Sequence, residues 1–192
     1  GVWLRKLNDI GEDEAIDLLA ASQLRVSNVV WAGGFTGSNG LSVGDSLSET
    51  IHALRVSAGL GAQCLVTYAG GRNNHTIRHA QRLLGYALDE LLPIAELCEV
   101  PLALEPMHPA CATGWTFLTD LEGTLDLLDA YSSPYLKLAL DTYHFPLDKV
   151  EQQTLNRLVP HLAVVHLGDR MEPQNIDCQR CHLGDGHVAV GQ

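Results

Sequence analysis

Short apolar runs alternate with amphipathic segments along the whole chain. The apolar runs, which predict strands, cover residues 24–32, 64–68, 101–105, 135–140 and 162–166. Apolar side chains that recur at a period of about 3.6 residues predict helices over residues 11–22, 45–60, 75–99, 118–131 and 150–158. Continuously apolar strands are typical of a parallel sheet, and so is strict alternation of strand and helix. The pattern therefore predicts an α/β fold, either a closed barrel or an open doubly wound sheet.

The composition is that of one folded domain over residues 1–192. Hydrophobic residues make up 46% of the chain and charged residues 18%, which suits a globular protein. No apolar run approaches the ~20 residues of a membrane helix. The formal net charge of −11 disfavours a nucleic-acid partner, because such binding depends on Lys and Arg neutralising phosphates. We therefore expect neither a membrane nor a nucleic-acid partner.

The cysteines bear on the cellular compartment. The five are Cys64, Cys98, Cys111, Cys178 and Cys181. An odd number, with three inside apolar segments, predicts reduced thiols and a cytoplasmic location. Cys178-Gln-Arg-Cys181-His182 matches the short pattern of c-type haem attachment, which does not suit a cytoplasmic chain. Zinc would require four ligands, and His182 is the one obvious further ligand nearby in sequence. We interpret Cys178 and Cys181 as reduced loop thiols with no assigned role.

Three successive predicted strands lead into a residue that can bind a metal. These residues are Glu105, Asp141 and His166. In a parallel barrel the C-terminal strand ends meet on one face, so these side chains are expected to converge. An isolated acid at a strand end is commonly a helix cap, but ligand types at three successive strand ends favour a shared site. Two carboxylates and an imidazole suit one divalent ion, with Mn²⁺ preferred and Zn²⁺, Co²⁺ or Mg²⁺ as alternatives.

Four motifs carry a resemblance to a known family. They are Leu-Glu-Pro-Met-His-Pro at 104–109, Asp-Thr-Tyr-His at 141–144, Val-His-Leu-Gly-Asp-Arg at 165–170 and Leu-Gly-Asp-Gly at 183–186. Nearly the whole chain resembles the xylose-isomerase-like sugar isomerases and epimerases, relatives of ketose 3-epimerases and endonuclease-IV-type enzymes. The resemblance implies a (β/α)8 TIM barrel with a divalent metal at Glu105, Asp141 and His166. It also implies that His144 and an arginine after the histidine strand contact substrate.

The chain departs from this family in two ways. The family's fourth metal ligand is a second glutamate on the last strand, which has no counterpart here, and the first strand would precede Gly1. We therefore expect an incomplete barrel that lacks its first and last strands, with a sixth strand near residues 188–190. The substrate arginine has two candidates. Arg170 directly follows the histidine strand, whereas Arg180 has the better spacing to the Gly184-Asp-Gly186 turn and is favoured.

Two further histidines are candidates for substrate contacts. His108 follows Glu105 by three residues and is expected to face the site, with a structural role between two prolines as the alternative. His75 follows a Gly-Gly loop and contacts either substrate or solvent at a helix start. Trp115 and Phe117 either line the sugar site or pack in the core.

These residues suit proton transfer at a carbon beside a carbonyl. A metal chelating an open-chain sugar would stabilise an enediolate, and Glu105 would take the proton as the catalytic base. We therefore expect an isomerase or epimerase of a sugar or sugar phosphate. The alternatives are an endonuclease-IV-like metal phosphodiesterase and a non-catalytic sugar-binding remnant. A small-molecule sugar is the expected partner, and because related barrels often associate, a homo-oligomer is also expected.

Overall fold

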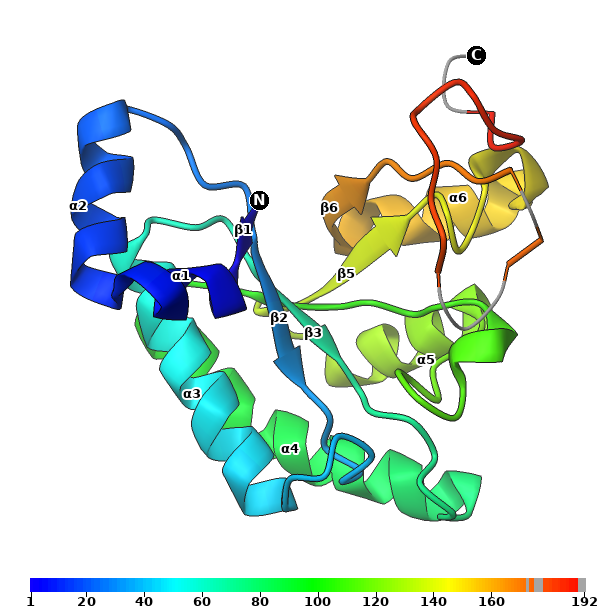
Figure 1. The fold of residues 1–192 in the computed structure, drawn as a ribbon. Helices are drawn as coiled ribbons and strands as arrows, with labels where there is room; N and C mark the ends of the chain where they lie inside the picture. Colours follow the sequence, from blue (N-terminus) through cyan, green and yellow to red (C-terminus); the bar gives the residue numbers. More distant parts are fainter. Residues whose placement is uncertain (172, 175–177, 190–192) are drawn as a thin grey trace.

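The chain folds around one six-stranded parallel sheet. The computed structural model describes residues 1–171, 173–174 and 178–189. Strands that are neighbours along the chain are also hydrogen-bonded neighbours in the sheet. In order they are β1 (Val2–Trp3), β2 (Val29–Gly33), β3 (Leu65–Tyr68), β4 (Leu102–Leu104), β5 (Leu136–Asp141) and β6 (Leu162–His166). The sheet curls as part of a barrel, with helices between successive strands (Figure 1).

Helices connect the strands, and several begin at residues that favour helix starts. They are α1 (Leu4–Ile10), α2 (Glu12–Ser22), α3 (Val43–Gly59), α4 (Ile77–Cys98), α5 (Leu121–Tyr131) and α6 (Gln152–Leu158). Ser42 and Asp45 form a capping box at α3, and Thr76 caps α4, which satisfies backbone N–H groups at both starts. Helix α4 runs continuously through Pro93, so this proline does not divide it.

The two faces of the sheet carry different apolar layers, and this distinguishes a barrel from an open sheet. Alternate strand residues, including Val29, Leu65 and Leu138, pack with helix residues such as Leu88 in the main core. The intervening residues form a second, smaller cluster without helical residues, made of Val30, Cys64, Val66, Ala103 and Ala139. Helices therefore cover one face, and the other face is the concave interior of a curled sheet. The barrel prediction is confirmed.

Two details at the ends of the chain differ from the sequence prediction. Val2 and Trp3 form β1, a two-residue strand that pairs with Val29 and Val30, and its apolar run is too short to be recognised. The strand expected at residues 188–190 does not form at Val188 or Ala189, which lie in irregular structure; Val190 is outside the described residues. In the described part of the chain, no helix is long and apolar enough to cross a membrane.

Candidate active site

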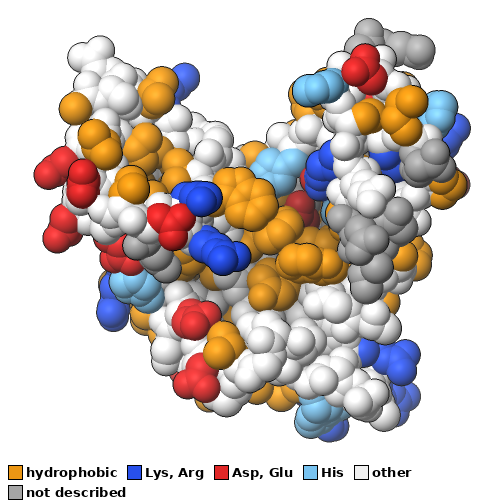
Figure 2. All heavy atoms as spheres, viewed as in Figure 1, with side chains coloured by type: hydrophobic (Ala, Val, Ile, Leu, Met, Phe, Trp, Pro, Cys, Tyr) orange, Lys and Arg blue, Asp and Glu red, His pale blue; other side chains and the backbone are white. Residues whose placement is uncertain are grey.

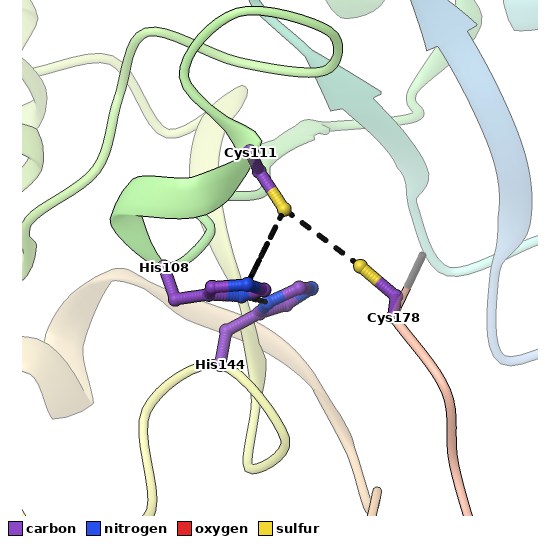
Figure 3. Close-up of side chains that lie close together, drawn as sticks. All are labelled: His108, Cys111, His144 and Cys178. Atoms are coloured by element: carbon purple, nitrogen blue, oxygen red, sulfur yellow. Dashed lines mark hydrogen bonds between the residues drawn. The ribbon is translucent and has the colours of Figure 1, made fainter. Parts of the chain in front are cut away.

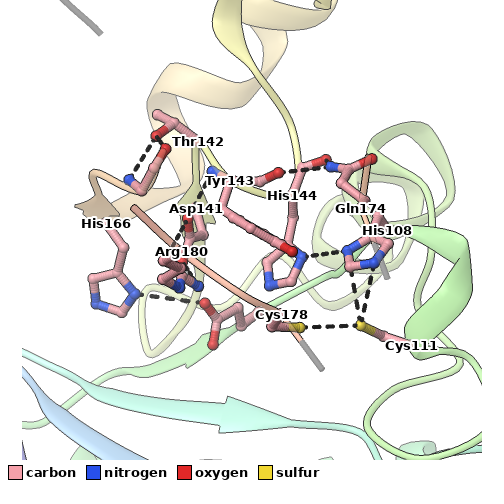
Figure 4. A network of polar contacts seen from close by, with 12 residues as sticks. His108, Cys111, Asp141, Thr142, Tyr143, His144, His166, Gln174, Cys178 and Arg180 are labelled. Carbon is pink, nitrogen blue, oxygen red and sulfur yellow. Dashed lines mark hydrogen bonds and ion pairs between the residues drawn. The ribbon is translucent and has the colours of Figure 1, made fainter. Parts of the chain in front are cut away.

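The three strand-end residues lie on the same face of the sheet. Glu105 follows β4 directly, and Asp141 and His166 end the paired strands β5 and β6 in register with each other. Glu105 Oε1 lies 3.5 Å from Nδ1 of His166. Ligand atoms of Glu105, Asp141 and His144 lie within 4.8 Å of one another. His166 thus adjoins this group through Glu105, whereas His144 belongs to it directly; Figure 4 shows both histidines near Asp141.

The two carboxylate oxygens of Glu105 differ in their surroundings, because only one of them accepts a hydrogen bond in the described part of the chain. The residue is 1% exposed, and Oε2 accepts a 2.7 Å hydrogen bond from the indole of Trp31. Oε1 is buried with no hydrogen-bond partner in the described part of the chain. An unsatisfied buried polar atom costs roughly 1–3 kcal/mol, and more when it is charged. A cation or a substrate proton at Oε1 would remove that cost, so this observation fits a divalent ion held between Glu105 and its neighbours.

Arg180, which the sequence favoured over Arg170 as the arginine that contacts substrate, reaches the same site. Its guanidinium bonds both oxygens of Asp141, at 2.7 Å to Oδ2 and 3.2 Å to Oδ1, and lies 4.7 Å from the ring centroid of Tyr143. The backbone N–H of Tyr143 also donates to Asp141 Oδ1, at 2.8 Å. Asp141 is therefore already neutralised, and a cation would compete with Arg180 for its oxygens.

Asp169 holds the segment that carries Arg180. It is fully buried, and its carboxylate accepts backbone N–H bonds from Arg170, Gly184, Gly186 and Val188. These bonds, that of Val188 first, lower the pKa of Asp169 to about 2. Its own carbonyl accepts from the N–H of Cys181, next to Arg180. The motif after β6 thus fixes the returning chain against the sheet.

His144 and His108 form a buried imidazole pair. Their Nδ1 atoms are 2.7 Å apart and their rings are stacked. Burial lowers the pKa of His144 to about 3, although Asp141 acts in the opposite direction, so this ring is neutral near pH 7. His144 lines the candidate cavity, and His108 lies behind it. Their contacts with substrate stay predictions.

Two thiols adjoin this pair, the buried Cys111 and the partly buried Cys178. Cys111 Sγ lies 3.8 Å from His108 Nδ1 and 3.7 Å from Cys178 Sγ. Burial raises the pKa of Cys111 to about 12 and also raises that of Cys178. Both thiols are therefore protonated near neutral pH as the chain stands. The sequence pattern gave no reason to pair Cys178 with Cys111 rather than with Cys181.

A cavity of about 560 Å³ opens above these groups. Asp141, His144, His166 and Arg180 line its polar part. Trp31 lies 5.6 Å from Trp3 and 5.4 Å from Trp115 between ring centroids, so that three indoles line an apolar part. Figure 2 shows hydrophobic side chains gathered in the hollow between two lobes.

Some expected wall and contact residues lie elsewhere. Trp115 lines the cavity as the sequence allowed, whereas Phe117 is 7% exposed and packs in the main core. His75 bonds the carbonyl of Thr36 through Nε2, at 3.2 Å, before the start of α4. It is outside the described lining of the cavity, and its contact with substrate stays a prediction. The cavity is also lined by Trp31, Asn28 and Met107, which the sequence did not reveal because positions in or next to apolar runs resemble core positions.

The chain belongs to the xylose isomerase-like TIM barrel family, whose pattern matches residues 5–192. A solved protein of Sinorhizobium meliloti 1021 is 27% identical, with a TM-score of 0.86 over 97% of this chain and 69% of its own. The 3-keto-D-glucoside 4-epimerase YcjR of E. coli is 16% identical, with a TM-score of 0.73 over 93% and 68%. A zinc-bound IolI protein is 19% identical, with a TM-score of 0.77 over 98% and 70%. No curated protein sequence matches this chain.

Proposed function

We propose that this chain acts on a sugar or sugar phosphate as a metal-dependent isomerase or epimerase, by proton transfer beside a carbonyl. The observation that carries the proposal is the unsatisfied Oε1 of Glu105, buried next to His166 beside a cavity with an aromatic wall. Sugars offer both hydroxyl groups for polar partners and C–H faces for aromatic rings. The epimerase named among the structural neighbours supports the same class of reaction.

Glu105, Asp141 and His166 are the residues that would hold the divalent ion. Their oxygen and nitrogen donors suit Mn²⁺, Zn²⁺, Co²⁺ or Mg²⁺, with Mn²⁺ preferred. The zinc-bound neighbour supports a divalent ion in this fold without fixing its identity here. When bound, the ion would polarise the substrate carbonyl and stabilise the charge of an enediolate.

The chain's own groups would position the substrate and move the proton. Trp31 donates to Oε2 of Glu105, and Oε1 carries two lone pairs, so that one could bind the ion and the other could accept a proton from the carbon beside the carbonyl. Arg180 would donate to a substrate hydroxyl or phosphate, for which a planar guanidinium is suited. Trp31 and Trp115 would pack on the C–H face of the sugar and exclude water. A cytoplasmic location and self-association stay predictions from the sequence.

Deuterium exchange tests the proton transfer directly. The chain is incubated with Mn²⁺ and a panel of ketoses and aldoses in D₂O, and deuterium beside the carbonyl is followed by NMR. We expect exchange with at least one sugar, and Glu105→Gln to lower its rate by ~10²–10⁴-fold, the usual contribution of a positioned acid–base group. Glu96→Gln, a change on the exposed side of α4, is the matched control. Equal exchange by Glu105→Gln and the control would contradict the proposal.

A further inference from the structure

Four side chains beside the candidate active site form a group of a different chemical kind. Ligand atoms of His108, Cys111, His144 and Cys178 all lie within 4.8 Å of one another (Figure 3). His108 directly precedes the short 3-10 turn Pro109–Cys111, and Cys111 is the last residue of that turn. His144 follows β5, and Cys178 lies beyond β6. Three separate segments therefore bring two nitrogen and two sulfur donors to one point.

The distances from the sulfur of Cys111 to its neighbours match those between the ligands of a tetrahedral zinc ion. Zn–S bonds of ~2.3 Å and Zn–N bonds of ~2.0–2.1 Å give tetrahedron edges of about 3.8 Å between sulfurs and about 3.6 Å between sulfur and nitrogen. The corresponding distances here are 3.7 Å for Cys111 to Cys178 and 3.8 Å for Cys111 to His108. The imidazole nitrogens, 2.7 Å apart in a hydrogen bond, would have to separate by roughly 0.6 Å.

We propose that His108, Cys111, His144 and Cys178 form a second metal site, which binds one zinc ion tetrahedrally. Two thiolates and two imidazoles select a borderline-soft ion, whereas the carboxylates of Glu105 and Asp141 do not. With four protein ligands and three of them buried, this site has no open position for a substrate. Zinc binding releases both thiol protons to solvent, and no oxidant or reductant takes part.

Zinc bound by these four residues would also fix a part of the candidate active site. Cys178 lies two residues before Arg180, which bonds Asp141. A zinc ion would therefore tie the segment after β6 to the loops after β4 and β5, and so hold the arginine over the cavity. The bond from Gln174 Nε2 to the carbonyl of His144, at 2.7 Å, joins the same two segments nearby (Figure 4). His108 and His144 are then ligands of zinc instead of groups that bind substrate.

Cobalt substitution tests this site independently of any enzyme activity. Co²⁺ bound by thiolates gives a near-ultraviolet sulfur-to-cobalt charge-transfer band, which an oxygen and nitrogen site such as Glu105, Asp141 and His166 does not give. We expect one equivalent of Co²⁺ to produce this band in the whole chain under reducing conditions, and Zn²⁺ to displace it. Cys178→Ser should abolish the band, and Cys181→Ser, a change three residues away in the same motif, should leave it intact.

Two further variants keep the test decisive if one of them folds poorly. Cys111→Ser and His108→Asn should each weaken zinc binding by at least tenfold, measured by competition with a chromophoric chelator on protein whose circular dichroism matches the parent. Absence of the charge-transfer band in the parent chain would overturn the proposal. So would a band that survives Cys178→Ser or disappears in Cys181→Ser. A Cys111–Cys178 disulfide that persists in reducing buffer, found by peptide mapping, would also overturn it.

Discussion

The indole of Trp31 donates a 2.7 Å hydrogen bond to Oε2 of Glu105, and so links the middle of β2 to the end of β4. This bond joins Trp31, in the aromatic wall of the cavity, to the buried carboxylate of Glu105. The same tryptophan lines the cavity with its ring. One residue therefore shapes the apolar wall and fixes the orientation of the proposed base, which leaves Oε1 as its reactive oxygen.

Replacing Trp31 by phenylalanine separates these two roles. Trp31→Phe keeps an aromatic ring but leaves both oxygens of Glu105 without hydrogen bonds in the described part of the chain. A hydrogen bond to a charged group contributes about 1.5–3 kcal/mol, so we expect kcat/KM for the exchange reaction to fall by roughly tenfold or more. Trp115→Phe, in the same wall, is the control and should change kcat/KM less. Equal losses in both variants would indicate that ring packing, and not the hydrogen bond, matters.

Arg180 is expected to oppose metal binding and to favour substrate binding. Its guanidinium bonds both oxygens of Asp141, a proposed metal ligand. Like charges a few ångströms apart repel by about 1 kcal/mol or more, so Arg180→Ala should bind Mn²⁺ several-fold more tightly. The same variant should raise KM for a sugar substrate by about tenfold through the lost charged donor. Calorimetric titration and kinetics measure the two effects, with Arg78→Ala on the exposed surface of α4 as control. Weaker Mn²⁺ binding by Arg180→Ala would show that the arginine supports the metal site.

Asp169 should make the stability of the fold depend on pH. Backbone N–H groups, that of Val188 first, lower its pKa from 3.8 to about 2. A pKa that is lower in the folded than in the unfolded state stabilises the fold above pH ~4, and this contribution is lost as the pH falls toward ~2. Asp169→Asn should therefore unfold at lower urea concentration at pH 7 and show a smaller difference between pH 5 and pH 2.5. Asp185→Asn, a change in the exposed turn whose backbone N–H groups bond Asp169, should behave like the parent. A pH dependence of stability in Asp169→Asn equal to that of the parent would show that Asp169 does not cause it.

The sequence predicted the strands and the residues whose positions follow directly from the strand ends. Apolar runs predicted five of the strands, and because parallel strands end on one face, the sequence also placed Glu105, Asp141 and His166 at one edge of the sheet. That these three residues share one ion stays a prediction. Cys111 and Cys178 could not be paired in this way, since 67 residues separate them and both lie outside strands. Trp31 also escaped notice, because nothing in an apolar run shows that its indole N–H reaches the next strand but one. Side-chain direction across loops is set by tertiary packing, which local patterns do not record.

His144 belongs geometrically to both groups of ligands, and its replacement decides which ion it serves. Ligand atoms of His144 lie within 4.8 Å of those of Glu105 and Asp141, and also of those of His108, Cys111 and Cys178. Its Nδ1, however, is the atom that faces His108 at 2.7 Å. We therefore expect His144→Asn to lose the cobalt charge-transfer band and to bind zinc at least tenfold more weakly.

The same His144→Asn protein should keep its affinity for Mn²⁺ within about twofold, because Glu105, Asp141 and His166 are the ligands proposed for that ion. Equilibrium dialysis with Mn²⁺ and cobalt spectroscopy on one preparation give both readouts. His75→Asn is the matched control, since its imidazole bonds Thr36 and belongs to neither ligand group in the described part of the chain. The opposite pattern, with Mn²⁺ binding lost and the cobalt band retained, would assign His144 to the carboxylate site and leave the thiolate site with three ligands.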